Sequence, residues 1–178
     1  MEEVKVAVTE FELGKNSTDP KGLGLEAQKI LETDLRLSEL FVKIMPPVYE
    51  DLEQTEIGKK EVDLWAWHQV GAQWLIKTEY SVIPGGKLSF VFRLYDTVGE
   101  QFLLGKRYTV GKHLLRKVIH RYADELVLQL TGKRGVAETQ LAFLSNDNGN
   151  QEIFTIDFDG FNSKQMTYDQ TLNLTPTW

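Results

Sequence analysis

The segment that decides the fold runs from residue 74 to residue 96 and reads WLIKTEYSVIPGGKLSFVFRLYD. Apolar and polar residues alternate on both sides of its centre, which is the period of a strand with one buried face. Pro84 and Gly85 suit positions i+1 and i+2 of a type II turn, because the second of these positions requires a positive φ. The segment therefore predicts a long β-hairpin.

The residues that follow the hairpin predict one more strand, a long helix and a closing strand. Residues 101–110 alternate again, after a turn at residues 96–100, and predict a third antiparallel strand. An apolar stripe at i, i+4 spacing then predicts a helix that ends at Gly132. The stripe contains Leu114, Val118, Tyr122, Leu126 and Leu130. Residues 136–144 predict the last strand of this domain.

The residues that precede the hairpin predict two strands, an amphipathic helix and a short helix. Residues 4–11 and 41–45 predict the strands, and Pro46-Pro47 ends the second one. The acidic residues 49–61 suggest a surface loop, and residues 63–70 suit two helical turns. Between the strands, the apolar face of the first helix is formed by Leu23, Ala27, Ile30, Leu31 and Leu35. The order β-α-β-α-βββ-α-β predicts an α/β fold, a two-layer sandwich of a mixed sheet with two main helices.

The last part of the chain has a different pattern. Residues 146–150 read NDNGN and suggest a hairpin tip or a boundary, and residues 151–158 and 164–168 suggest short strands around an Asp159-Gly160 turn. Short strands of this kind are typical of a β-propeller blade. A propeller needs at least about 4 blades of ~40 residues each. The tail therefore predicts an incomplete blade.

Composition excludes several classes of protein. With 42% hydrophobic and 26% charged residues, the 178-residue chain lies far from the disordered class. It has no cysteine, which excludes disulfides, thiol nucleophiles and thiolate metal sites. No run approaches the ~20 apolar residues of a membrane span, and the start lacks the features of a signal peptide. The net charge of -6 argues against nucleic-acid binding over the whole surface.

Four segments carry a resemblance to a known family. The first helix and next strand read EAQKILETDLRLSELF (residues 26–41), and the hairpin carries VGAQWLIKTEYSV (residues 70–82) and GGKLSFVFRLYDT (residues 85–97). The second helix reads LRKVIHRYADELVLQLTGKRG (residues 115–135), and the tail reads IFTIDFDGFNSKQMTYDQTLNLTPTW (residues 153–178). In order and spacing these segments resemble the TolB family of the bacterial Tol-Pal system. Pro176 and Trp178 resemble the opening of the Trp-Ser-Pro-Asp-Gly motif of its first blade.

The resemblance implies a periplasmic scaffold protein that acts in outer-membrane integrity, envelope constriction during cell division and import of colicin-type macromolecules. It implies an N-terminal α/β domain at residues 1–147 and a fragment of the first propeller blade at residues 148–178. Neither catalytic residues nor a cofactor or metal ion are expected, and the partner-binding residues stay unassigned. The whole protein is expected to bind partner proteins and neither nucleic acid nor the membrane interior.

Two departures from the family concern its partners, a TolA-like inner-membrane protein and a Pal-like lipoprotein. The family binds the first through a segment that precedes the first strand, where this chain has only residues 1–3 before Val4. It binds the second largely through the propeller, of which only part of one blade is expected here. The resemblance therefore predicts that both partner sites are missing and that the chain is a shortened form of a longer protein, in which Met1 replaces a signal peptide and the TolA-binding segment.

A nucleotide site, a metal site and a calcium site are alternatives that the residues suggest only weakly. Gly22-x-Gly24-x-x-Ala27 has the form of a dinucleotide fingerprint, but about ten residues separate it from the preceding strand, so a flexible helix entry is favoured. His68, His113 and His120 lack a metal-ligand spacing, which favours surface or capping roles. Asp157, Asp159 and Asn162 lack the further ligands of a calcium loop, so a turn is favoured.

Nucleic-acid binding and hydrolysis are the competing functions. A basic patch on the second helix and after it would suit an acidic partner or RNA, as in anticodon-binding domains of similar fold, although it lacks interleaved aromatics. The patch contains Lys112, Arg116, Lys117, Arg121, Lys133 and Arg134. Hydrolase activity is the enzymatic alternative, but the sequence lacks the Gly-x-Ser-x-Gly motif of such enzymes. Among the tryptophans, Trp67 and Trp74 are predicted to face the core, and Trp65 is predicted to be partly exposed.

Overall fold

The computed structural model describes residues 3–57, 61–146, 149, 151–168 and 176. The chain divides into two compact units, residues 1–119 and 120–178, and the division falls within helix α4 (Leu115–Thr131). No helix in the described part of the chain combines the length and the apolar composition that crossing a bilayer requires.

A mixed sheet forms the first unit, with the strand order β3-β1-β4-β5-β6 and β2 also paired to β4. Its strands are β1 (Val4–Val8), β2 (Glu12–Leu13), β3 (Phe41–Lys43), β4 (Trp74–Ile83), β5 (Lys87–Asp96) and β6 (Gln101–Gly111). Strand β1 is parallel to β3 and β4, whereas β4, β5 and β6 are antiparallel. The sheet is mixed, as predicted.

The predicted hairpin is confirmed. Strands β4 and β5 pair from Trp74 opposite Asp96 to Ile83 opposite Lys87. Gly85 has φ 81°, the positive value that the predicted turn requires. The third strand, β6, pairs along β5, with one irregularity between Leu94 and Tyr95. The three strands are the longest of the chain and fix the frame of the sheet.

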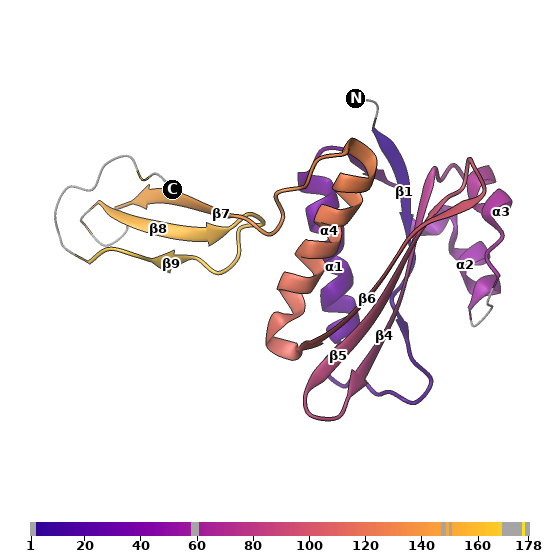
Figure 1. The fold of residues 1–178 in the computed structure, drawn as a ribbon, viewed down its shortest axis with the longest axis horizontal. Coiled ribbons are helices and arrows are strands. Elements are labelled where there is room, and N and C mark those ends of the chain that lie inside the picture. Colours follow the sequence, from indigo (N-terminus) through magenta and orange to yellow (C-terminus); the bar gives the residue numbers. More distant parts are fainter. Residues whose placement is uncertain (1–2, 58–60, 147–148, 150, 169–175, 177–178) are drawn as a thin grey trace. The chain divides into compact units, whose positions relative to one another are not determined.

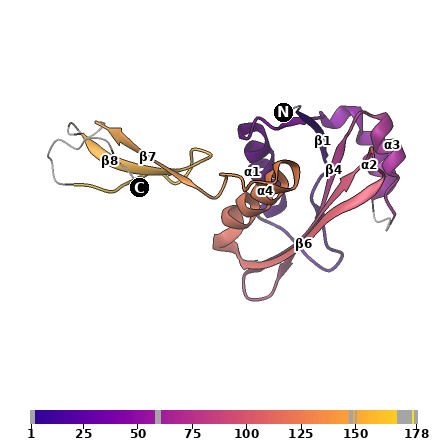
Figure 2. The same cartoon turned by 45° about the horizontal axis from the view of Figure 1, so that its top comes forward.

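Helices cover both faces of the sheet around β1 and β4. The helices of the first unit are α1 (Leu23–Leu37), the 3-10 turn η1 (Pro46–Val48), α2 (Glu50–Glu56), α3 (Leu64–Gln69), the 3-10 turn η2 (Lys112–Leu114) and the start of α4. Figures 1 and 2 show α1 on one side of β1 and β4, and α2 with α3 on the other. The expected two-layer sandwich is therefore modified, because a third layer covers this part of the sheet.

The α1 side of the sheet holds the larger core. Side chains from alternate strand positions are buried there, together with the apolar stripe of α1. Phe90 and Phe92 stack with ring centroids 5.5 Å apart, and Phe11 meets Phe92 edge to face at 6.2 Å. The predicted apolar face of α1 is confirmed for Ala27, Ile30, Leu31 and Leu35, whereas Leu23 is only partly buried. Asp34, which the pattern placed on the polar side, is buried as well.

The opposite side of the sheet holds a second buried cluster. It contains Ala7, Tyr49, Trp67, Ala72 and Leu75. Tyr49 and Trp67 bring η1 and α3 together, with ring centroids 5.2 Å apart, and the Tyr49 hydroxyl donates to the carbonyl of Val8 at 2.8 Å. Ala7 and Val8 are neighbours in β1, so their side chains bury one on each face of the sheet.

The prediction of a surface loop at residues 49–61 is wrong over its first half, because residues 50–56 form α2. Three acidic residues, Glu50, Asp51 and Glu53, lie in the first turn of this helix, where the positive end of the helix dipole favours negative charge. The helix also buries Glu56. The polar composition of this segment suggested a loop, whereas the contacts of Glu53 and Glu56 with other elements stabilise a helix.

The second unit contains the end of α4 and a separate sheet in the order β7-β8-β9. These strands are β7 (Gln140–Ser145), β8 (Glu152–Asp157) and β9 (Lys164–Gln165). The predicted cap at Gly132 is confirmed by its φ of 72° and its hydrogen bond to Leu128. The strand predicted at residues 136–144 was assigned to the wrong sheet, because β7 pairs with β8 and not with the strands of the first unit. Residues 147–148, 150 and 177–178 of the expected boundary and blade motif lie outside the described residues.

Candidate partner-binding groove

A groove of about 380 Å³ lies on the face of the sheet that also carries α2 and α3. Its walls come from residues 12–15, residues 77–79 of β4, Arg93 and Tyr95 of β5, and Val62. The register places Lys77 directly opposite Arg93. Because side chains alternate along a strand, Lys77, Glu79, Arg93 and Tyr95 project from the same face. The groove is therefore an open strip of sheet with charged walls.

Arg93 and Glu79, two of the charged residues that line the groove, are only loosely paired. Arg93 and Glu79 lie 3.7 Å apart, and both side chains are at least one-third exposed. An exposed pair of this kind contributes about 0–1 kcal/mol, so the guanidinium stays accessible to another carboxylate. Burial raises the pKa of the Tyr95 hydroxyl, which therefore remains a neutral hydrogen-bonding group at neutral pH. The groove offers binding groups of both signs.

One end of the groove is fixed by a buried carboxylate, Glu56, which is 3% exposed. Its Oε2 accepts hydrogen bonds from Trp67 Nε1 at 2.9 Å and from Lys77 Nζ at 3.0 Å. Its Oε1 accepts from the backbone N–H of Asp63 at 2.9 Å. We call these four residues the Glu56 cluster. It ties α2, α3 and β4 together and holds the Lys77 ammonium in place beside the groove.

A second acidic residue of α2, Glu53, contacts the chain after β1. Its Oε1 accepts from the backbone N–H of Glu10 at 2.5 Å. Burial raises the pKa of the Glu53 carboxyl, and the hydrogen bond from Glu10 opposes that effect without cancelling it. The helix is thus attached to the sheet by two carboxylates, Glu53 and Glu56.

Of the three tryptophans for which a position was predicted, Trp67 and Trp65 lie as expected. Trp67 is fully buried within the Glu56 cluster, and Trp65 is 60% exposed on α3. Trp74 is half-buried and packs on Phe41 with ring centroids 5.7 Å apart. The predicted exposure of Trp65 is confirmed, and it leaves a large aromatic side chain on the surface of α3.

The glycine motif at the start of α1 does not form a nucleotide site. Asp19 Oδ2 accepts from the backbone N–H of Gly24 and from the Tyr80 hydroxyl, both at 2.9 Å. Burial acts to raise the pKa of Asp19, but the hydrogen bonds from Gly24, Leu23 and Tyr80 outweigh it and lower the pKa. The carboxylate occupies the helix start, where a dinucleotide fold would hold a phosphate.

Gly24 is a glycine for a packing reason. A Cβ at this position would lie 2.3 Å from the Tyr80 ring. Burial and the bond to Asp19 raise the pKa of Tyr80 to about 12, so the hydroxyl keeps its proton and remains a donor. The prediction of a flexible helix entry is wrong, because Asp19 and Tyr80 hold the entry in place.

The three histidines do not come together. His68 and His113 are exposed, as predicted. His120 is buried, which contradicts the predicted surface or capping role, and its Nε2 lies 3.8 Å from Asp159 Oδ2 in the second unit. The burial of His120 could not be predicted from the apolar stripe of α4, because its neighbour Asp159 lies 39 positions away in the sequence.

The predicted turn after β8 is confirmed. Asp157 Oδ2 accepts from Asn162 Nδ2 at 2.5 Å, and the backbone N–H of Gly160 donates to the Asp157 carbonyl at 2.8 Å. Asp159 Oδ1 accepts from the backbone N–H of Phe161 at 3.2 Å. These oxygens serve the turn itself.

The predicted basic patch is divided. Arg121 and Arg134 both reach Glu138, at 3.3 Å and 2.5 Å, so two of the six charges are partly neutralised within the second unit. Asp124 holds the same segment, since its two oxygens accept from the backbone N–H groups of Ala137 and Glu138. Lys112, Arg116 and Lys117 belong to the first unit. Two of the six charges of the predicted patch are therefore engaged in ion pairs within the second unit.

Sequence reasoning missed Glu56, Lys77, Glu53 and Asp19. Their partners lie between 5 and 61 positions away, and no local period marks such pairs. The sequence offered one signal for α2: acidic residues are enriched in the first turn of helices, so the acidic run at its start could have predicted the helix.

Comparisons with known proteins agree with this fold. The sequence model of the TolB amino-terminal domain matches residues 1–103. The chain is 32% identical over 158 residues to the Tol-Pal system protein TolB of Geobacter sulfurreducens, which covers 89% of this chain and 36% of the relative. It is 31% identical over 173 residues to the protein of the same name from Syntrophotalea carbinolica, covering 96% of this chain and 40% of the relative. The chain thus spans well under half the length of these relatives.

A solved structure gives the same result for the fold. The crystal structure of TolB from Acinetobacter baumannii aligns with a TM-score of 0.76 at 19% sequence identity, covering 100% of this chain and 42% of that one. Since the family model covers more than half of the sequence, this chain belongs to the TolB amino-terminal domain family.

Proposed function

We propose that the chain is a protein-protein interaction module of a periplasmic scaffold in the Tol-Pal system and that it has no catalytic role. The match of residues 1–103 to the TolB amino-terminal domain carries the proposal. Relatives that align along most of the chain bear the name Tol-Pal system protein TolB. In this role the whole protein supports outer-membrane integrity, envelope constriction during division and import of colicin-type macromolecules.

The partners proposed for the whole protein are a TolA-like inner-membrane protein and a Pal-like lipoprotein. The groove supports a role in protein recognition, because Arg93 and Glu79 present both signs of charge on the exposed strip of sheet. Complementary charges of this kind favour specificity and the rate of association. The RNA-binding alternative loses support, since Arg121 and Arg134 are paired with Glu138.

We also propose that residues 1–147 form the α/β domain and that residues 148–178 begin a β-propeller. The proposed boundary falls between β7 and β8, which pair with each other, so β7 would join the sheet of the blade as a strand contributed by the α/β domain. Its three short antiparallel strands support this assignment. So do the exposed apolar side chains Leu141, Met166 and Tyr168, which neighbouring blades would cover.

Binding of purified partners tests the proposal. We expect the full-length protein to bind the TolA-like and Pal-like proteins of its own organism and Arg93→Glu to weaken at least one affinity by about tenfold. Arg36→Glu is the matched control, because Arg36 is exposed on α1 away from the groove. Failure of the full-length protein to bind either partner would sink the proposed function. Equal affinities for both variants would exclude the groove as the binding site but leave the proposed function standing. Turnover of an ester or peptide substrate would refute the non-catalytic role.

A further inference from the structure

Positive charge gathers at one end of the first unit, although the whole chain carries a net charge of -6. Residues 14–23, 81–90 and 109–119 meet at this end. These three segments hold six lysines and arginines and one acidic residue, Asp19. The six cations are Lys15, Lys21, Lys87, Lys112, Arg116 and Lys117. Asp19 keeps its negative charge, because its donors Gly24 and Tyr80 are neutral, so the six cations exceed the one acidic residue by five.

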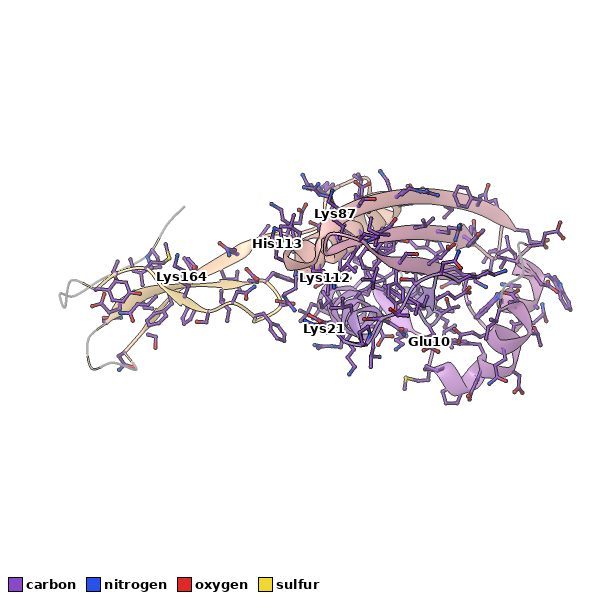
Figure 3. All side chains as sticks on the ribbon, turned by 90° about the horizontal axis from the view of Figure 1, so that it is seen from below. Glu10, Lys21, Lys87, Lys112, His113 and Lys164 are labelled. Atoms are coloured by element: carbon purple, nitrogen blue, oxygen red, sulfur yellow. The ribbon has the colours of Figure 1, made fainter. Side chains whose placement is uncertain are left out.

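Hydrogen bonds bring the three segments together. The backbone N–H of Val82 donates to Ser17 Oγ at 2.7 Å, which fixes the loop before α1 against the end of β4. The backbone N–H of Lys112 donates to the carbonyl of Gly86 at 3.0 Å, which fixes the start of η2 against the hairpin turn. Figure 3 looks onto this end and shows the labelled Lys21, Lys87 and Lys112 around it. We call this surface the basic end.

The charges of the basic end face solvent. Lys21, Lys87 and Lys117 are exposed. Among the residues that the structure describes, no carboxylate lies within ion-pair distance of these three lysines or of Lys112. Helix α4 also begins here, and the N-terminus of a helix carries about half a positive charge. Each contribution adds to a positive potential of the same surface.

Two leucines give the basic end an apolar component. Leu114, directly before α4, is 38% exposed, and Leu25, which lies two residues beyond the first segment and beside the exposed Glu26 in the first turn of α1, is 58% exposed. Exposed lysines around apolar side chains are the composition of a surface that lies on an anionic bilayer. We propose that the basic end docks the protein on anionic lipid headgroups, without insertion into the bilayer. This inference is independent of the proposed Tol-Pal role.

The composition favours lipid phosphates over other polyanions. Lysine is a compact point charge on a flexible stem, which suits a fluid layer of phosphates better than a fixed bidentate contact. The three segments present no exposed Phe, Tyr or Trp among the described residues and only one exposed imidazole, His113, so the row of aromatic side chains on which single-stranded nucleic acid stacks is missing. An acidic peptide would use the same charges, and the experiment separates it from lipid.

Vesicle sedimentation with the 178-residue chain tests the proposal. We expect binding to vesicles of phosphatidylglycerol and phosphatidylethanolamine and no binding to pure phosphatidylcholine. Raising the ionic strength from ~0.1 M to ~1 M shortens the screening length from about 10 Å to about 3 Å and should release the protein. This salt release needs no variant, so it does not depend on how a substitution affects folding.

Charge reversal locates the surface. The triple variant Lys21→Glu, Lys87→Glu, Lys117→Glu should lose at least about 100-fold in vesicle affinity, because each lysine near the surface contributes about fivefold. The control is the triple variant Lys5→Glu, Lys29→Glu, Lys164→Glu. These three lysines are also exposed, lie outside the basic end and give the same net charge. The control should bind within a few-fold of the unmodified chain.

Three results would overturn the proposal. The first is failure of the unmodified chain to bind anionic vesicles, and the second is an equal loss in both triple variants, which would show an effect of net charge alone. The third is tighter binding of poly-glutamate or an RNA oligonucleotide than of vesicles through the same lysines, which would identify the basic end as a protein or nucleic-acid site.

Discussion

The carboxylate of Glu56 accepts hydrogen bonds from three donors, Asp63, Trp67 and Lys77. Removing one partner of a buried ion pair leaves the other charge uncompensated, which costs about 3–5 kcal/mol. We therefore expect Glu56→Ala to lower the free energy of unfolding by about that amount. Urea denaturation followed by far-UV circular dichroism measures the change.

Glu50→Ala is the control for Glu56, because Glu50 is exposed in the first turn of the same helix. Its effect should stay within about 0.5–1 kcal/mol, the size of a helix-dipole contribution. The double variant Glu56→Ala, Lys77→Met should lose less than the sum of the two single variants, because neither charge is then left alone. Additive losses would contradict a direct ion pair.

Asp19 predicts a dependence of stability on pH. Its pKa in the folded protein lies below the ordinary value of 3.8, so the ionised carboxylate stabilises the fold above that pH. The stabilisation is lost as the pH falls through the lower, folded pKa. We expect Asp19→Ala to cost about 1 kcal/mol at neutral pH, as for a helix cap. The difference between variant and unmodified protein should shrink below pH 3.8.

Thermal unfolding at a series of pH values measures the effect of Asp19. Asp51→Ala serves as the comparison, since Asp51 is an exposed acidic residue of another helix. A loss at Asp19 that grows as the pH falls below 3.8 would have the wrong sign for a lowered pKa and would refute the assignment.

The strands of the first sheet differ in how many of their backbone groups are hydrogen-bonded to neighbouring strands. Strand β5 pairs along its whole length with β4 on one side and with β6 on the other, whereas β3 has three residues and lies at an edge. Amides with paired neighbours on both sides open last. We expect peptides of β5 to exchange hydrogen slowest and those of β3 much faster, as measured by mass spectrometry. Slower exchange in β3 than in β5 would contradict the strand order.

Elements with a strong local period could be predicted from the sequence, and those selected by distant contacts could not. The hairpin at residues 74–96 and helices α1 and α4 follow from alternation and from i, i+4 stripes. Helix α2 was missed because its stability rests on Glu53 and Glu56, whose partners lie in other elements. The sequence predicts β7 as a strand but in the wrong sheet, because the period of apolar residues does not show which strand pairs with it.

For the whole molecule, the two units are expected to differ in stability. The sheet of the second unit has three short strands and exposes Leu141, Met166 and Tyr168. A small sheet of this kind buries too little apolar surface to be strongly stable. We expect β7 and β8 to lose their hydrogen-exchange protection at lower urea concentration than β4 and β5. Coincident loss in all four strands would contradict this expectation.

The candidate sites depend on meetings between distant segments, which only the whole fold provides. The basic end collects cations from three segments, and the groove collects its walls from β2, β4 and β5. The sequence showed the cluster of cations around Lys112 and Arg116 but grouped it with Arg121 and Arg134, because helical neighbours are visible in a sequence and hairpin neighbours are not. The family resemblance predicted the fold, but it did not predict the groove or the basic end.

Strand β1 lies between two parallel neighbours, β3 and β4, close to the start of the chain. A pull applied ahead of Val4 along the axis of the strand would load both hydrogen-bond ladders in shear. All the bonds of β1 would then share the load at once, instead of opening one after another as in a hairpin pulled apart at its ends. The placement of β1 gives the first unit mechanical resistance at the point where the chain enters it.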